Sequence, residues 1–136
     1  MITRRTFVMS SLASTAIAAP LYAAYAPENF EVDIWRSLRN SEARVVFNFR
    51  ASWSHTCDIK AELLDSLIAQ NPSYRALDIV EVDWDTFGPS QMAERLKIQR
   101  QSTLIALRGR TEIARVENQP FENQLRAFLD TALRAG

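Results

Sequence analysis

Cysteine is almost absent from this chain, because Cys57 is the only one among 136 residues. A disulfide within the chain is therefore impossible. In an oxidising compartment cysteines usually occur in pairs, so a lone one is either buried and inert or kept for reactions between molecules. The sequence leaves both roles open for Cys57.

Net charge is absent as well, since 16 basic residues balance 16 acidic ones. A neutral chain gives no reason to expect nucleic acid as a partner. The sequence contains no internal repeat and no low-complexity segment, and its length suits one ordinary domain. With 47% hydrophobic and 24% charged residues, that domain has the composition of a globular protein.

The N-terminal segment, residues 1–26, lacks an apolar run long enough for a convincing membrane span. Its charged start, mildly apolar middle and small residues at the end are the layout of an export signal. The stretch Thr3–Val8, which contains Arg4 and Arg5, resembles the twin-arginine signal of proteins exported already folded, and an ordinary secretory signal is the alternative. We therefore expect a periplasmic protein whose folded domain occupies residues 27–136.

Two positions are candidates for cleavage of this signal. The run Ala24–Ala26 fits the small-x-small rule, although Pro27 would follow the cut and is unfavourable there. The run Ala16–Ala18 is the other candidate. The only links expected with a membrane are an uncleaved signal or a membrane-bound electron donor.

Hydrophobic periodicity predicts helices that alternate with strands along the rest of the chain. The expected helices span residues 30–38, 56–70 and 89–98 and a last segment that starts at Pro120, and the expected strands span 44–49, 77–82, 102–107 and 111–116. An acidic loop is expected at 83–85 and a hairpin turn at 108–110. This order predicts an α/β fold with a central mixed β-sheet flanked by helices on both sides.

A short motif, Trp-Ser-His-Thr-Cys at residues 53–57, follows the first strong strand. Together with the order of elements, this motif resembles the thioredoxin family, and the agreement extends to Phe47–Phe49, Ala51, Asp83 and Thr103–Leu104. The resemblance covers the chain from about Phe30 to the C-terminal helix. It implies the thioredoxin fold and is greatest to exported thioredoxin-like proteins of bacteria that carry a Trp-Cys-x-x-Cys motif.

In this family the first cysteine of the motif attacks as a thiolate at a helix N-terminus, and the second resolves the mixed disulfide. The attacking position matches Ser54 and the resolving position matches Cys57. A serine hydroxyl stays protonated near neutral pH, and its oxygen cannot form a disulfide. The resemblance therefore implies a degenerate Ser-x-x-Cys motif that lacks the two-cysteine cycle.

Two further positions differ from the family. The buried carboxylate that accepts a proton falls on Asn48, and the cis-proline that helps bind substrate falls on Ser102, just before Thr103. We expect a trans bond before Ser102, because the cis form of a non-proline residue costs about 3 kcal/mol more. The resemblance places Trp53, Ser102 and Thr103 at a substrate groove, which these changes would reshape.

The motif residues have structural explanations as well as chemical ones. Ser54 is expected to cap the helix that follows it, since serine stabilises a helix N-terminus by about 1 kcal/mol over alanine. Cys57 is either a small buried apolar group or a lone thiol that forms mixed disulfides. His55 either helps to stabilise a nearby thiolate, and so shifts the pKa of that thiol, or is exposed to solvent without a chemical role.

No cofactor and no metal are expected. A metal site built on His55 and Cys57 would need a further ligand. The only residues that could supply one are Met92, Asp83 and Asp85, and nothing in their spacing brings them close.

Two functions follow from these residues. In the first, a thiol–disulfide oxidoreductase-like protein uses Cys57 alone to form transient mixed disulfides with an exported protein client or a small thiol. In the second, a redox-inactive thioredoxin-fold module binds protein partners or acts like a chaperone. The first function requires an accessible Cys57, whereas the second predicts a buried one.

Overall fold

The computed structural model describes residues 24–135. The export signal expected over residues 1–26 therefore lies almost wholly outside the described residues. Within the described range, no helix is long and apolar enough to cross a membrane.

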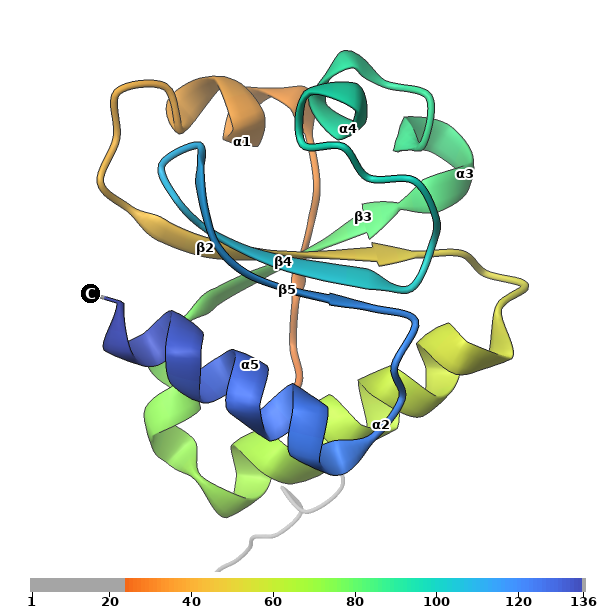
Figure 1. Cartoon of the computed structure of the whole chain (residues 1–136), viewed down its shortest axis with the longest axis vertical. Helices are drawn as coiled ribbons and strands as arrows, with labels where there is room; N and C mark the ends of the chain where they lie inside the picture. Colours follow the sequence, from red (N-terminus) through yellow and green to blue (C-terminus); the bar gives the residue numbers. More distant parts are fainter. Residues whose placement is uncertain (1–23, 136) are drawn as a thin grey trace, which may run out of the picture.

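A five-stranded mixed sheet forms the centre of the molecule (Figure 1). Its strands are β1 (Glu28–Asn29), β2 (Arg44–Arg50), β3 (Asp78–Asp83), β4 (Thr103–Arg108) and β5 (Thr111–Glu117), and they lie in the order β1-β3-β2-β4-β5. The first three strands in this order are parallel, while β4 and β5 are antiparallel to their neighbours. The expected mixed sheet is confirmed, with β1 as an addition that the sequence pattern did not reveal.

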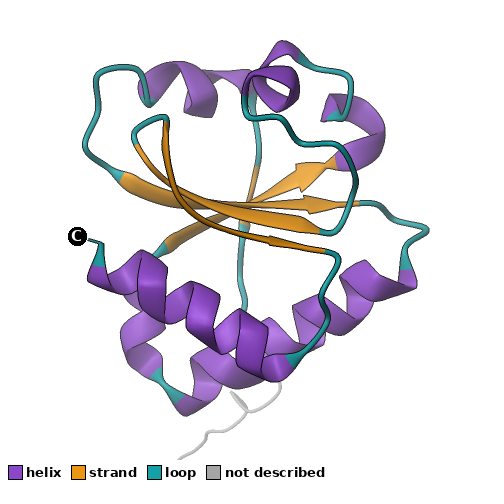
Figure 2. Cartoon of the chain, in the orientation of Figure 1, coloured by secondary structure: helices purple, strands orange, loops and turns teal. Residues whose placement is uncertain are grey.

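Helices cover both faces of the sheet, as expected (Figure 2). One face carries α2 (His55–Gln70), the 3-10 helix η3 (Pro72–Ala76) and α5 (Glu122–Arg134), and the other carries α1 (Val32–Ser37), α3 (Trp84–Phe87) and α4 (Gln91–Arg95). The expectation of an acidic loop at 83–85 is wrong, because one helical turn starts at Trp84.

All four predicted helix starts also move: the helix expected from residue 30 begins at Val32, and the helix expected from residue 56 begins at His55. The helix expected from Pro89 begins at Gln91, because the side chain of Ser90 caps it by accepting a hydrogen bond from the Ala93 backbone N–H. The last helix begins at Glu122 and not at Pro120. All four shifts are of one or two residues, which is the usual uncertainty of helix ends.

The core consists of two layers, one on each face of the sheet. Side chains of a strand alternate between its faces, so Phe47 and Phe49 pack toward α1, α3 and α4, whereas Val46 packs toward α2 and α5. The central strand β2 thus contributes side chains to both layers of the core. Its C-terminal end also sets the position of the Trp-Ser-His-Thr-Cys motif, which covers the end of the connection from β2 and the first turn of α2.

Candidate functional site

Ser54 ends the turn between β2 and α2 and is the N-cap of α2. Its backbone N–H donates to the Ala51 carbonyl at 3.2 Å, which closes the turn. Its Oγ accepts a hydrogen bond from the Cys57 backbone N–H at 3.3 Å. The hydroxyl at the position of the family's attacking sulfur is therefore used to satisfy a free N–H group of the helix start.

Cys57 lies one turn further along α2 and is only 2% exposed. Its sulfur points at the Phe49 carbonyl oxygen, 3.9 Å away, which is a weak S–H contact. The backbone N–H of Ser102 donates to the same oxygen at 2.8 Å. The fold thus brings Cys57 and Ser102 together at the end of β2, with the thiol covered from solvent.

Ser102 is the most strained residue of this site. The peptide bonds of the described residues are all trans, in line with the expectation for the bond before Ser102, but Ser102 itself has φ +64°, in the left-handed region. It is fully buried, and its Oγ is the one buried side-chain nitrogen or oxygen of residues 24–135 that has no hydrogen-bond partner. A buried hydroxyl without a partner costs about 1–3 kcal/mol.

Lys60 is a member of the site that the sequence reasoning missed. It is completely buried, and its ammonium group donates to the Ser102 carbonyl. Burial lowers the pKa of Lys60 to about 8, although attraction to Cys57 works in the opposite direction. The signal was its spacing, because Cys57, Lys60, Leu64 and Leu67 recur every three or four residues along the buried face of α2.

Trp53, His55 and Thr103 have different environments. The Trp53 ring is 63% exposed, and its Nε1 donates to Asp85 at 2.9 Å. His55 is the exposed first residue of α2, and Thr103 is buried, with its hydroxyl donating to the Arg100 carbonyl at 2.9 Å. Of the three residues expected at a substrate groove, Trp53 is at the surface, whereas Ser102 and Thr103 lie beneath it.

Asn48 occupies the position of the family's buried carboxylate and donates its amide N–H to the Tyr25 hydroxyl oxygen at 2.7 Å. The Tyr25 hydroxyl in turn donates to Glu81 at 3.2 Å, and the Tyr25 backbone N–H donates to Asp65 at 2.9 Å. Burial raises the pKa of Tyr25, so its hydroxyl stays protonated. Tyr25, which the sequence reasoning placed in the export signal, is therefore bound to the folded domain.

Residues 24–135 contain no group of three or more His, Cys, Asp or Glu side chains able to hold a metal ion. Met92 is buried in the core layer under α4. Asp85 is held by Trp53, as described above. The structure does not bring either of them to Cys57 as a ligand cluster.

Sequence comparison found no matching protein-family model and no matching curated protein. Solved structures do match. Trxlp from Edwardsiella tarda EIB202 is 26% identical over 76% of this chain and 98% of its own, with a TM-score of 0.65. The thioredoxin of Malassezia sympodialis is 19% identical over 79% of this chain and 91% of its own, with a TM-score of 0.66. The thioredoxin of Trypanosoma brucei brucei is 18% identical over 82% of this chain and 94% of its own, with a TM-score of 0.63.

The chain has the thioredoxin fold. Thioredoxins are among the solved structures that match it, and this likeness shows the fold. Within the thioredoxin fold of this chain, the connection from β2 to α2 carries Ser54, and Cys57 follows it inside the helix.

Proposed function

We propose that this chain is an exported, periplasmic thioredoxin-fold module that binds a protein client and lacks dithiol activity. The observation that carries the proposal is the burial of Cys57. In thiol–disulfide exchange a thiolate attacks one sulfur of a disulfide and displaces the other, so the partner must reach the thiol directly. Cys57 is covered, and Ser54 offers only an oxygen that already caps α2.

The surface available to a client lies beside the motif. Trp53 presents an exposed aromatic ring, and a cavity of about 420 Å³ opens nearby at the ends of β2 and β3. Its charged lining residues are Arg50, Asp58, Glu81 and Asp83, so carboxylates outnumber guanidinium groups three to one. A client segment that carries a basic residue next to an apolar one would complement this surface.

A second candidate function is single-thiol chemistry, and the position of Lys60 favours it. Attraction between a Cys57 thiolate and the Lys60 ammonium group raises the pKa of Lys60. The two residues lie one turn apart on the buried face of α2. If the start of α2 opened, Cys57 could attack a small disulfide, form a mixed disulfide and release one thiolate.

The two functions differ in the reactivity of Cys57. We would time its modification by an aromatic disulfide reagent in the native protein and in denaturant, with Cys57→Ala as the zero-signal control. For a binding module we expect reaction at least about a hundredfold slower in the native state, because the helix start must open first. Equal rates in the two states would overturn the binding-module proposal and support single-thiol chemistry.

Export is tested separately. Replacing Arg4 and Arg5 by lysine should retain the protein in the cytoplasm if the twin-arginine route carries it, whereas an ordinary secretory signal would tolerate the change. We also propose that processing leaves Tyr25 in the mature chain, because Tyr25 contacts Asn48, Glu81 and Asp65. N-terminal sequencing of the periplasmic form should then show a start upstream of Tyr25, and a start at Pro27 would contradict this.

A further inference from the structure

A second cavity, of about 370 Å³, opens on the face of the sheet opposite α2, between α1, α4 and the turn from β4 to β5. We call it the arginine pocket, and its lining includes Trp35, Phe87, Arg36, Arg39, Arg95 and Arg110. Its volume falls in the range of about 300–1,000 Å³ that is typical of small-molecule sites. None of Trp53, Ser54 and Cys57 lines it.

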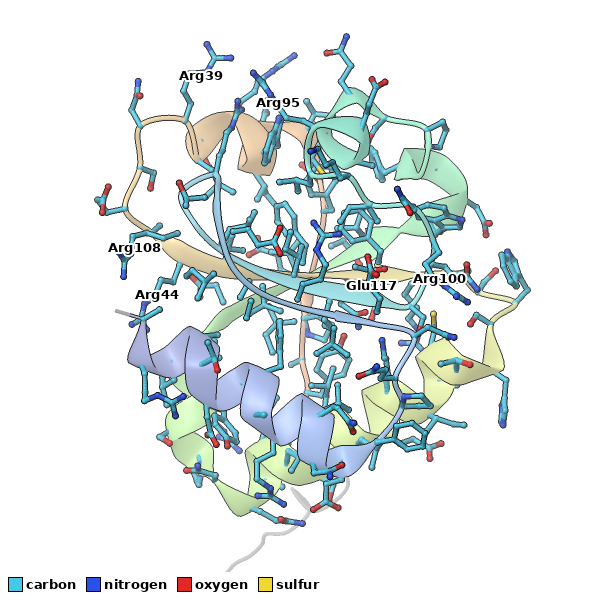
Figure 3. The ribbon with its side chains drawn as sticks, in the orientation of Figure 1. Arg39, Arg44, Arg95, Arg100, Arg108 and Glu117 are labelled. Carbon is cyan, nitrogen blue, oxygen red and sulfur yellow. The ribbon has the colours of Figure 1, made fainter. Side chains whose placement is uncertain are left out.

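The four arginines reach this pocket from three separate segments. Arg36 belongs to α1 and Arg39 to the turn after it, Arg95 is the last residue of α4, and Arg110 lies in the turn between β4 and β5. Figure 3 shows Arg39 and Arg95 at the same end of the molecule, above α1 and α4. The fold therefore gathers positive charge that is dispersed along a neutral chain.

Negative charge does not balance this cluster. No Asp or Glu lines the pocket. Arg36 forms an ion pair with Asp33 at 3.3 Å, whereas no carboxylate of residues 24–135 lies within ion-pair distance of Arg39, Arg95 or Arg110. The excess charge contrasts with Arg50, which contacts both Asp58 and Glu81 at the other cavity.

Arg110 lines the pocket and contacts Trp35. Its guanidinium carbon lies 3.9 Å from the centre of the Trp35 ring, and its Nε and Nη2 donate to the Trp35 carbonyl at 3.3 and 2.8 Å. Burial lowers the pKa of Arg110, and the charges of Arg39 and Arg95 lower it further. These three guanidinium groups therefore repel one another, and a bound anion would relieve that repulsion.

We propose that the arginine pocket binds a small amphipathic anion, namely a carboxylate or phosphate group carried on an aromatic or aliphatic body. Guanidinium groups are suited to carboxylate and phosphate because their planar forks donate paired hydrogen bonds to two oxygens. Phe87 and Trp35, which also line the pocket, supply apolar surface for the rest of the ligand. The pocket shares Phe30 and Phe87 with the cavity beside Trp53, whereas none of its four arginines lines that cavity.

The probe for this site is anilinonaphthalene sulfonate, an aromatic anion whose fluorescence reports its binding to the processed protein. Its uncharged analogue, N-phenylnaphthylamine, has the same rings without the sulfonate. We expect saturable binding of the anion that weakens about tenfold in the Arg39→Gln, Arg95→Gln double variant, because two charge-assisted contacts are lost. Added salt should also weaken it, whereas N-phenylnaphthylamine should bind at least about tenfold more weakly than the anion.

Arg100→Gln is the matched control, since Arg100 is also exposed but does not line the pocket. It should change the affinity by less than about twofold. Benzoate should displace the probe and benzyl alcohol should not. Three results would each overturn the proposal. The double variant and Arg100→Gln could bind the probe with equal affinity, or the uncharged analogue could bind as well as the anion. The protein could also bind phosphatidylglycerol vesicles without binding the probe. Circular dichroism and the unfolding midpoint of each variant verify that it is folded.

Discussion

Lys60 should make the stability of this protein rise with pH above neutrality. The side chain is fully buried, and its pKa falls from 10.5 in the unfolded chain to about 8 in the fold. Between these two values the unfolded chain holds a proton that the folded chain has lost, so raising the pH favours the folded state. The stabilisation is complete above pH 10.5 and is lost as the pH falls through about 8.

The size of this effect follows from the pKa difference. At about 1.4 kcal/mol for each pH unit, the lowered pKa corresponds to about 3 kcal/mol in the free energy of unfolding. Lys60→Met removes the titrating group and keeps a long, flexible side chain of similar size. The free energy of unfolding of the wild type minus that of Lys60→Met should therefore rise by about 3 kcal/mol from pH 7 to pH 10.5, whatever its value at pH 7.

Urea unfolding followed by tryptophan fluorescence at several pH values measures this difference. Tyr25 loses its proton in this range only in the unfolded chain, so it affects both proteins equally and cancels. The other lysine of the chain, Lys97, is exposed, so Lys97→Met is the matched control and should keep the pH dependence of the wild type. Parallel stability curves for Lys60→Met and the wild type would refute the reasoning.

Two other substitutions test the strained and the tethered parts of the site. Ser102→Gly should raise the free energy of unfolding by about 1 kcal/mol. It removes the left-handed strain and the unpartnered hydroxyl, and this gain exceeds the cost of the added entropy of the unfolded chain. A lower urea midpoint would contradict this. Tyr25→Phe should lower it by about 1–2 kcal/mol, since the buried Asn48 amide loses its acceptor and Glu81 loses a donor. An unchanged midpoint for Tyr25→Phe would show that the N-terminal segment is not part of the stable domain.

Most of the fold could be predicted because local patterns carry it. The apolar run of β2 and the buried stripe of α2 are each visible in a few consecutive residues. β1 could not be found this way, because a strand of two residues has no periodicity and exists only through its pairing with β3. Helix α3 was missed because a single helical turn is also too short to show a periodicity.

The candidate site was only partly predictable. The residues from Trp53 to Cys57 were found because their motif is contiguous. Lys60 was missed because charge normally indicates an exposed side chain, and its burial depends on the Ser102 carbonyl from the segment before β4. The contacts of Tyr25 with the domain were missed because the small residues around it resemble the end of a signal. Its hydrogen-bond partners lie in α2, β2 and β3.

The sequence by itself determined that no disulfide can form within this chain, since that requires a second sulfur. It also determined the cap of α2, because a serine next to a helix start acts through bonds to its immediate neighbours. The tertiary structure alone decided that Cys57 is covered and that four dispersed arginines share one pocket. The exposure of a thiol and the total charge around a pocket both depend on which distant segments pack together. The arrangement of strands and helices in the fold determines that packing.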